Sequence, residues 1–459
     1  GTAGNVDPLQ RPHKREDFAP LPWLGPRGGS TTEADGGRGR SARAAAPLIP
    51  RVVPSWRALR GGAPMTRRGG ERPPLHVKDV VASLSVARCL ALPQPAATRD
   101  ELAHAARWLR DGAVYEIIAE TLAHTTLRAH KTAFDEDDLK IIFDLRKIER
   151  AAETPLAYCN AFPRNEEKEE GERRRPIFEP LINDIVAASP APELETTTRY
   201  TPKDDIRRFV FENACAAQFD FAAWFDQFAL EPAIRKFFGV HTPTGDHSLC
   251  VLPMGFRPSC QVAQAATNAI KSVSVQTPSA SCVDNVLFLG SRPSVYAASK
   301  EFVVRSAFVG AQIKDTTIRI ETEYDFLGEH YDHVLRTRCL TQKTADKAHY
   351  AATVLASKPS LRTRQLQAIF GLLLYAANTL RITIAKFHWA MRFLSSVCAT
   401  EQHVEHEIPS DVRAEPLAWA AVAYTNSPVD VYTPDCDPDF VLYPDASAYG
   451  WGAISISRG

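Results

Sequence analysis

Between residues 102 and 118, apolar residues recur with helical spacing. The sequence T-R-D-E that starts at Thr98 is typical of a capping box, and an interruption falls at Gly112. We therefore predict a small helical region between about residues 77 and 158. The apolar residues with this spacing are Leu102, Ala106, Leu109, Tyr115 and Ile118.

Between about residues 176 and 330, short apolar runs alternate with a long helical stretch. This alternation predicts an α+β fold, because short apolar runs bounded by turn residues are typical of strands. The strand-like runs are FAAWF, SLCVLPM, VDNVLFLG and DFLGEHYD, and the helical stretch is QVAQAATNAIKSV.

Residues 360 to 399 have helical spacing again, with Ser360 as the expected N-cap. Residues 402 to 438 contain five prolines and predict a loop, and FVLYPDASAYGWGAISI then predicts a strand, a polar turn and a second strand. The expected buried face of the helix consists of Leu366, Ile369, Phe370, Leu373 and Ala377.

Charge changes this picture mainly at the start of the chain. Lysine plus arginine equal aspartate plus glutamate at 54 each, but 13 basic residues face 6 acidic ones up to Pro74, among many glycines and prolines. Such a segment cannot offset its ordering entropy by burial. We expect residues 1–76 to be a disordered basic arm that holds phosphates loosely, or else an inert tail, and the charged run at 165 to 175 to be a solvated linker.

The remaining composition argues for a protein inside the cell, in the cytoplasm or the nucleus. Nine scattered cysteines without a CxxC pair indicate reduced thiols, and a disulfide framework or zinc site is not expected. Neither a long apolar run nor a secretory leader is present, so we expect no membrane association and no secretion. We interpret His241 and His247, near Asp246, as polar loop residues.

Two aspartates carry the candidate chemistry. Nucleotidyl transfer uses two divalent ions about 3.5 to 4 Å apart, held by aspartates that converge from different strands. Asp220 ends an apolar run, and Asp284 with Asn285 follows Val283 in a pattern suited to the turn of a hairpin. Each aspartate alone would be interpreted as a solvated turn residue, and only their order and their neighbours favour a catalytic site.

At this point the chain resembles the reverse transcriptases. Their palm motifs are a strand that ends in Asp with an aromatic residue five positions on, then LPxGxxxSP, YxDD, a Lys and FLG. The matching positions, in the same order, are Asp220 with Phe225, Leu252 to Gly255 with Ser259, Cys282 to Asn285, Lys314, and Phe326 to Gly328. Upstream, RRRPIFEPLIND resembles a fingers strand that ends at Asn183, and a one-residue ambiguity leaves Arg174 and Arg175 both open as its basic residue.

The resemblance implies a right-hand polymerase: fingers, a palm with an antiparallel sheet and a helical thumb, followed by the first strands of an RNase H-like domain. RYTPKDDIRRFVF and DAS...GWGA are most similar to the tyrosine-recombinase retroelements of the DIRS-like and VIPER-like group. The implied regions are a helical N-terminal region and charged linker at 77–172, fingers and palm at 173–334, thumb and connection at 335–400, a linker at 401–438 and a truncated RNase H-like domain at 439–459.

The resemblance also implies the roles of single residues. Asp220, the Phe221 carbonyl and Asp284 would bind two Mg²⁺ or Mn²⁺ ions, and Lys314 would donate a proton to pyrophosphate unless it is a surface lysine. Phe225 would exclude the ribose 2′-hydroxyl, although a core aromatic is the other interpretation. The remaining implied residues are Gly255, Ser259 and Gln264 for nucleotide and template, Phe326, Leu327 and Gly328 for the primer grip, and Asp445 for RNase H.

The expected partners are an RNA template, a DNA primer, their RNA/DNA hybrid and deoxynucleoside triphosphates. Asn285 replaces a second aspartate and Cys282 replaces the usual tyrosine, so an inactive nucleic-acid-binding protein from a decayed or domesticated element is the alternative. An RNA-dependent RNA polymerase is a weaker one. RNase H cleavage is not expected, because Asp445 alone is present of the acids that this reaction needs.

Overall fold

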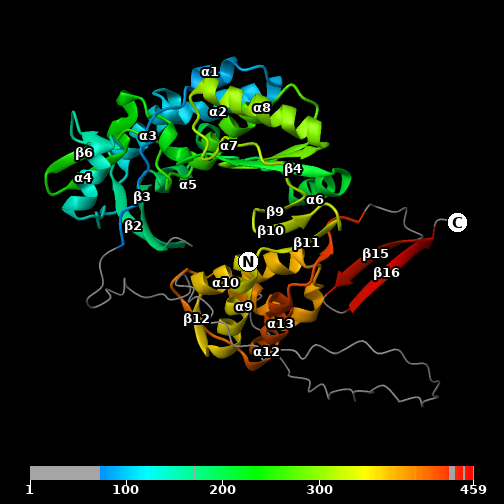
Figure 1. The fold of residues 1–459 in the computed structure, drawn as a ribbon. Coiled ribbons are helices and arrows are strands. Elements are labelled where there is room, and N and C mark those ends of the chain that lie inside the picture. Colours follow the sequence, from blue (N-terminus) through cyan, green and yellow to red (C-terminus); the bar gives the residue numbers. More distant parts are fainter. Residues whose placement is uncertain (1–72, 169–170, 398–399, 434–439, 448–449, 458–459) are drawn as a thin grey trace, which may run out of the picture. The chain divides into compact units, whose positions relative to one another are not determined.

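The structure is a computed structural model that describes residues 73–168, 171–397, 400–433, 440–447 and 450–457 (Figure 1). Almost all of the arm predicted at residues 1–76 lies outside the described residues. Its described end is paired with the rest of the chain: Leu75 forms a parallel bridge with Arg174, and the Arg174 N–H donates to the Pro74 carbonyl at 3.0 Å.

The predicted N-terminal helical region is confirmed. Gly112, at φ 147°, separates a 3-10 turn from the next helix, as expected. The capping box at Thr98 is wrong, because the helix begins two residues earlier and Pro95, whose φ of −56° suits a helix start, is its N-cap. The elements are α1 (Val86–Ala91), α2 (Ala96–Ala106), η2 (Arg107–Leu109), α3 (Ala113–His124), α4 (Glu136–Asp144) and β1 (Ile148–Arg150).

The charged run is not a linker. Its described residues belong to two paired strands, as residues 165–168 of β2 (Cys159–Lys168) and 171–175 of β3 (Gly171–Pro180). Glu166 lies opposite Arg173 and bonds it at 3.0 Å, and its second oxygen lies 3.1 Å from Arg175. Opposite charges that face each other across strands stabilise the pair, so a run without apolar periodicity can still be a hairpin.

A three-stranded antiparallel sheet forms the centre, in the order β4 (Cys215–Asp220), β8 (Asn285–Gly290), β7 (Ser279–Cys282). Alternate side chains of β8 pack into two different cores. Val286 and Phe288 join the core that contains α7 (Ser259–Lys271) and α8 (Arg292–Val309), whereas Leu287 and Leu289 join the core that contains α6 (Lys203–Glu212). Figure 1 shows α8 running along β4, which it contacts.

The predicted strand FAAWF is wrong. Ala223 has a left-handed backbone, at φ 44°, which ends the extended chain and starts the 3-10 helix η4 (Trp224–Gln227). SLCVLPM is extended only at its start, in β6. The other elements of this part are α5 (Asn183–Ala188), η3 (Pro192–Leu194), η5 (Pro232–Phe237), β5 (Gly239–Thr242) and β6 (Gly245–Leu249). The interpretation of His241 and His247 as loop residues is wrong, because they lie in β5 and β6; the His241 Nδ1 lies 2.8 Å from Asp246.

The helix predicted after residue 360 has its expected buried face, since all five of the predicted apolar residues are at most 2% exposed. Ser360 is not its N-cap, because Ser360 pairs with Glu407 in a short strand and the helix begins at Thr363. The run DFLGEHYD forms the hairpin β9–β10. The elements are β9 (Glu323–Phe326), β10 (Glu329–Asp332), β11 (Thr337–Leu340), α9 (Gln342–Ser357), β12 (Ser360–Arg362), α10 (Thr363–Thr379), η6 (Ile384–Phe387) and α11 (His388–Val397).

The loop predicted at residues 402 to 438 is also wrong for residues 402–433, and its last five residues lie outside the described residues. Pro409 is the N-cap of the helix at 410–414, and Pro416 lies in the first turn of the helix at 416–425. In a first turn the backbone N–H has no partner within the helix, so its absence in proline breaks no hydrogen bond. The two strands expected at the end are confirmed as an antiparallel pair, and residues 448–449 of the expected turn lie outside the described residues. The elements are β13 (Glu405–Glu407), α12 (Ser410–Ala414), α13 (Pro416–Thr425), β14 (Val429–Asp430), β15 (Phe440–Ser447) and β16 (Gly450–Ser457). Within the described residues, no helix is long and apolar enough to cross a membrane.

Candidate active site

Strand pairing brings the two predicted aspartates together. Asp220 is the last residue of β4 and lies opposite Asn285, the first residue of β8, while Asp284 occupies the turn just before it. The Phe221 N–H donates to the Asp284 carbonyl at 2.9 Å, which fixes the turn against the end of β4. The predicted convergence of acids from two strands is therefore present.

The turn that carries Asp284 is strained and supported from α7. Val283 has φ 55°, a left-handed conformation that a β-branched residue rarely adopts. Its N–H donates to Gln264 Oε1 at 2.7 Å, and its carbonyl accepts from the Thr267 hydroxyl at 2.5 Å. Both polar groups of the strained peptide are thus held by two buried side chains one helical turn apart.

Burial, followed by the negative charge of Asp220, raises the pKa of Asp284 to about 6. Asn285 Nδ2 donates to Asp284 Oδ1 at 3.2 Å. The Oδ1 atom of Asp220 is buried and has no hydrogen-bond partner among the described residues. An orphaned carboxylate oxygen beside a second acid is what a site built for a cation would present.

Lys314 is the third member of the site. Its ammonium pairs with Asp220 Oδ2, and its backbone N–H donates to the Asp220 carbonyl at 2.9 Å. The preceding residues extend this pairing: Ile313 bridges Phe221, and the Ala222 N–H donates to the Gln312 carbonyl. The structure therefore brings together Asp220, Asp284 and Lys314, whose sequence positions span almost a hundred residues.

A second basic residue, Lys78, lies near Asp220 and Lys314, and no sequence motif predicts it. Burial, and then the positive charge of Lys314, lowers the pKa of Lys78, while Asp220 raises it. Arg173 and Arg175 also lie close enough to act on Lys78. Lys78 belongs to the segment that follows the Leu75 bridge to β3, and the local sequence HVKDVV carries no motif that could have identified it.

Arg174 and Arg175, which the sequence left as alternatives for the basic residue of the fingers strand, have different surroundings in the structure. Arg174 is 7% exposed and forms a two-pronged ion pair with Asp138, with both distances 2.7 Å. Arg175 lies on the other face of β3, half-buried, where it acts on Lys78. Arg174 therefore has a structural role, whereas Arg175 lies on the face of β3 near Lys78.

Gly255 and Ser259 shape the loop that the LPxG motif predicted. A Cβ on Gly255 would lie 2.4 Å from the Phe178 carbonyl oxygen, so only glycine fits against β3. The Asn183 amide donates to the Gly255 carbonyl at 2.8 Å, and the buried Ser259 hydroxyl donates to the Pro253 carbonyl at 2.7 Å. These residues hold the loop, and Gln264 holds the Asp284 turn.

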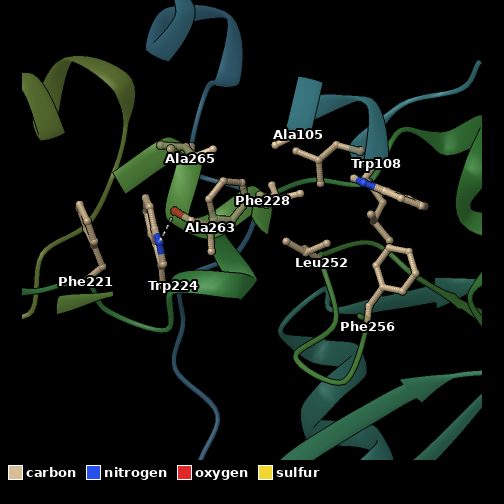
Figure 2. Close-up of a cluster of buried hydrophobic side chains, with 14 of the residues drawn as sticks. Ala105, Trp108, Phe221, Trp224, Phe228, Leu252, Phe256, Ala263 and Ala265 are labelled. Atoms are coloured by element: carbon tan, nitrogen blue, oxygen red, sulfur yellow. Dashed lines mark hydrogen bonds between the residues drawn. The ribbon is translucent and has the colours of Figure 1, made fainter. Parts of the chain in front are cut away.

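The aromatic residues after Asp220 divide between core and surface. The Phe221 ring is buried and stacks on Trp224, with centroids 3.9 Å apart (Figure 2). The Trp224 N–H donates to the Ala263 carbonyl at 3.2 Å, shown as the dashed line in Figure 2. Phe225, in η4, is only half-buried and packs against the edge of this core.

The predicted primer-grip residues form the turn of β9–β10. Leu327 and Gly328 have φ of 49° and 83°, and the Tyr375 hydroxyl donates to the Leu327 carbonyl at 2.5 Å. Phe326 is 3% exposed within a core, so its side chain supports the turn from inside. Asp445 lies in β15, opposite Gly452, and its side chain lies outside the described part of the chain.

Among the described residues, no group of three or more His, Cys, Asp or Glu side chains is placed to hold a metal ion. Asp220 and Asp284 therefore supply two carboxylates, and further oxygen ligands would have to come from the backbone, a substrate or water. Carboxylate and carbonyl oxygens are the ligands that Mg²⁺ and Mn²⁺ prefer, so the donor set fits these ions.

No family model and no curated protein matches the sequence. Among solved structures, the chain is similar to a foamy viral protease-reverse transcriptase, dRH, in complex with double-stranded DNA, with a TM-score of 0.51 and 12% identity over 83% of this chain and 70% of that chain. A second foamy viral protease-reverse transcriptase in complex with double-stranded DNA has a TM-score of 0.48 and 13% identity over 84% and 80%. The first likeness confirms the predicted fold class: an α+β fold with antiparallel sheets like that of the reverse transcriptases.

Proposed function

We propose that this chain is an RNA-directed DNA polymerase, the reverse transcriptase of a retrotransposon related to the DIRS-like or VIPER-like elements. The observation that carries the proposal is the meeting of Asp220 and Asp284 at the end of one sheet, with a partnerless Asp220 oxygen and Lys314 beside them. The reverse-transcriptase-like fold supports it.

In this proposal Asp220, Asp284 and the Phe221 carbonyl hold two Mg²⁺ or Mn²⁺ ions. Such ions activate the primer hydroxyl and neutralise charge that develops on the triphosphate. The remaining proposed roles belong to side chains of the protein. Lys314, which the ion pair with Asp220 holds beside the acids, would donate a proton to the departing pyrophosphate.

The proposed partners are an RNA template, a DNA primer, the RNA/DNA hybrid and deoxynucleoside triphosphates, in the cytoplasm or nucleus. The similar foamy viral structure contains double-stranded DNA, which supports a nucleic-acid partner. Lys78 and Arg175 supply positive charge for the triphosphate, and the half-buried ring of Phe225 would exclude a ribose 2′-hydroxyl. Leu327 and Gly328 would contact the primer end.

The test is primer extension on an RNA template with deoxynucleotides, in Mg²⁺ and in Mn²⁺. We expect extension by the wild type and its loss in Asp284→Ala, whereas Asp325→Ala, an exposed acid in β9, should extend normally. Asn285→Asp would place a carboxylate opposite Asp220 and should increase extension. Failure of every variant to extend, with RNA binding retained, would instead support an inactive nucleic-acid-binding protein.

A further inference from the structure

A second charged region lies beside the start of α6 and the end of α10. It is a cavity of about 410 Å³, and neither Asp220 nor Asp284 is among the residues that line it. This volume falls within the range of small-molecule sites. Its charged and amide-bearing lining residues are Asp204, Arg207, Arg338, Asn378 and Arg381, and Tyr432 flanks them.

Arg338 is the most unusual of these residues, because it is 3% exposed and no carboxylate among the described residues pairs with it. Its guanidinium donates to the carbonyls of Thr379 and Asp430 at 2.9 and 3.0 Å, and to that of Val431. Carbonyl oxygens accept hydrogen bonds from its N–H groups but do not neutralise its positive charge. Burial of a charge without a paired anion carries a large desolvation free energy.

The surrounding charges do not cancel. Arg207 pairs with Glu329 at 2.7 Å and with Asp204 at 3.0 Å, and the same Glu329 also pairs with Lys203 at 2.9 Å. Arg338 and Arg381 add two further cations, so four cations face two carboxylates among the described residues, where Arg381 has no ion pair. Burial, followed by the charge of Arg207, lowers the pKa of Arg338 to about 10; the Glu329 charge opposes this shift and the Arg381 charge adds to it.

We propose that this cavity binds a phosphate group, held directly by the exposed guanidinium group of Arg381 and attracted by the positive charges of Arg207 and Arg338, whose N–H groups already donate to protein acceptors. Guanidinium offers a planar fork of N–H donors that matches phosphate oxygens, and a dianionic phosphate would balance the excess charge. The half-buried Tyr432 provides an aromatic surface on which a base can stack. The phosphate belongs either to a free mononucleotide or to the backbone of a nucleic-acid strand.

The experiment compares wild type, Arg381→Gln and the control Arg392→Gln, using the full chain without divalent ions or deoxynucleotides. Arg381 is exposed at the cavity, and Arg392 is an arginine of α11 that does not line it. Calorimetry measures the binding of AMP and of inorganic phosphate. Fluorescence anisotropy measures the affinity for a labelled primer-template duplex over a series of salt concentrations.

Weaker binding of AMP or phosphate by about tenfold in Arg381→Gln alone would establish a free nucleotide as the source. Unchanged or undetectable AMP and phosphate binding, with duplex affinity lowered and its salt slope reduced by about one in Arg381→Gln alone, would identify the backbone of a strand. If Arg381→Gln matches Arg392→Gln in every assay, the proposal is overturned. Because these assays involve no nucleotide incorporation, their outcome is separate from that of the polymerase test.

Discussion

At the scale of single residues, the candidate site depends on the protonation of Asp284. Its pKa of about 6 lies above the ordinary value of 3.8, since burial and the Asp220 charge disfavour the ionised form. The folded state therefore binds this proton more tightly than the unfolded state does. Its contribution to stability is complete below pH 3.8 and is lost as the pH rises through 6 in the absence of metal.

A divalent ion must compete with that proton. We expect the Mg²⁺ or Mn²⁺ affinity, measured by calorimetry without substrate, to fall by up to about tenfold for each pH unit below 6 and to level off above pH 7. Asp284→Asn should bind weakly at every pH, and Asp325→Asn should behave like the wild type. An affinity equal at pH 5 and pH 7.5 in the wild type would remove Asp284 as a metal ligand.

At the scale of elements, helix α7 positions the hairpin β7–β8. Gln264 is 1% exposed and accepts from the N–H of the strained Val283. Replacing Gln264 by Met preserves the size of the side chain but leaves this N–H unpaired. We expect a stability loss of about 1 to 3 kcal/mol and a lower kcat, by about tenfold to a hundredfold, with little change in KM.

The matched control for this prediction is Gln261→Met. Gln261 is also buried in α7, but its Oε1 has no partner within the described part of the chain. Its replacement should leave kcat near that of the wild type. Equal losses of kcat in both variants would mean that α7 supports the site only through general stability. These values come from steady-state kinetics and urea unfolding.

A second element-level prediction concerns Glu329, which joins β10 to α6 and α10. Its carboxylate is fully buried and accepts from Arg207, Lys203, the Tyr331 hydroxyl at 2.6 Å and the Thr379 hydroxyl at 2.9 Å. Burial alone would raise the pKa of Glu329, but the Arg207 hydrogen bond and the Lys203 charge hold it at about 2. Its stabilising effect is therefore complete above pH 4.5 and is lost as the pH falls through 2.

Glu329→Gln leaves Arg207 and Lys203 with reduced compensation in a buried place. We expect it to lower the free energy of unfolding at pH 7 by about 3 to 5 kcal/mol, measured by urea denaturation. Asp204 pairs with the same Arg207, but its side chain is 85% exposed. Asp204→Asn should therefore change stability by less than about 0.5 kcal/mol, and a similar loss in both variants would contradict the network.

At the scale of the whole molecule, the features that sequence patterns predict are those that arise from short-range order. The palm-like motifs, the helical stretch at 261–273, which α7 largely covers, and the buried face of α10 were predicted because a motif or a period of 3.6 is visible locally. The hairpin at 165–175 was missed because its stability comes from charges that pair across strands. The helices after Pro409 and Pro416 were missed because proline was interpreted only as a breaker, although it is accepted in a first turn.

The site shows the same limit. Asp220, Asp284 and Lys314 were predicted because their motifs occur in a fixed order, while the choice between Arg174 and Arg175 depended on which face of β3 meets Asp138. Lys78 was missed because nothing around it is distinctive and its place depends on the bridge of Leu75 to β3. Which basic residues lie near Asp220 and Asp284 depends on contacts between segments far apart in the sequence, and local sequence patterns do not predict such contacts.

The position of Lys78 leads to a prediction about substrate binding. Lys78 belongs to the first described segment of the chain, outside every local motif, and the charges of Asp220 and Lys314 act on it. If its charge helps to hold the triphosphate, Lys78→Gln should raise KM for deoxynucleotides by about fivefold to tenfold while kcat changes little, because a long-range charge contributes mainly to binding. Lys140→Gln, an exposed lysine of α4, is the control. A lower kcat with an unchanged KM would assign Lys78 to the chemical step, and no change in either would make it a structural residue.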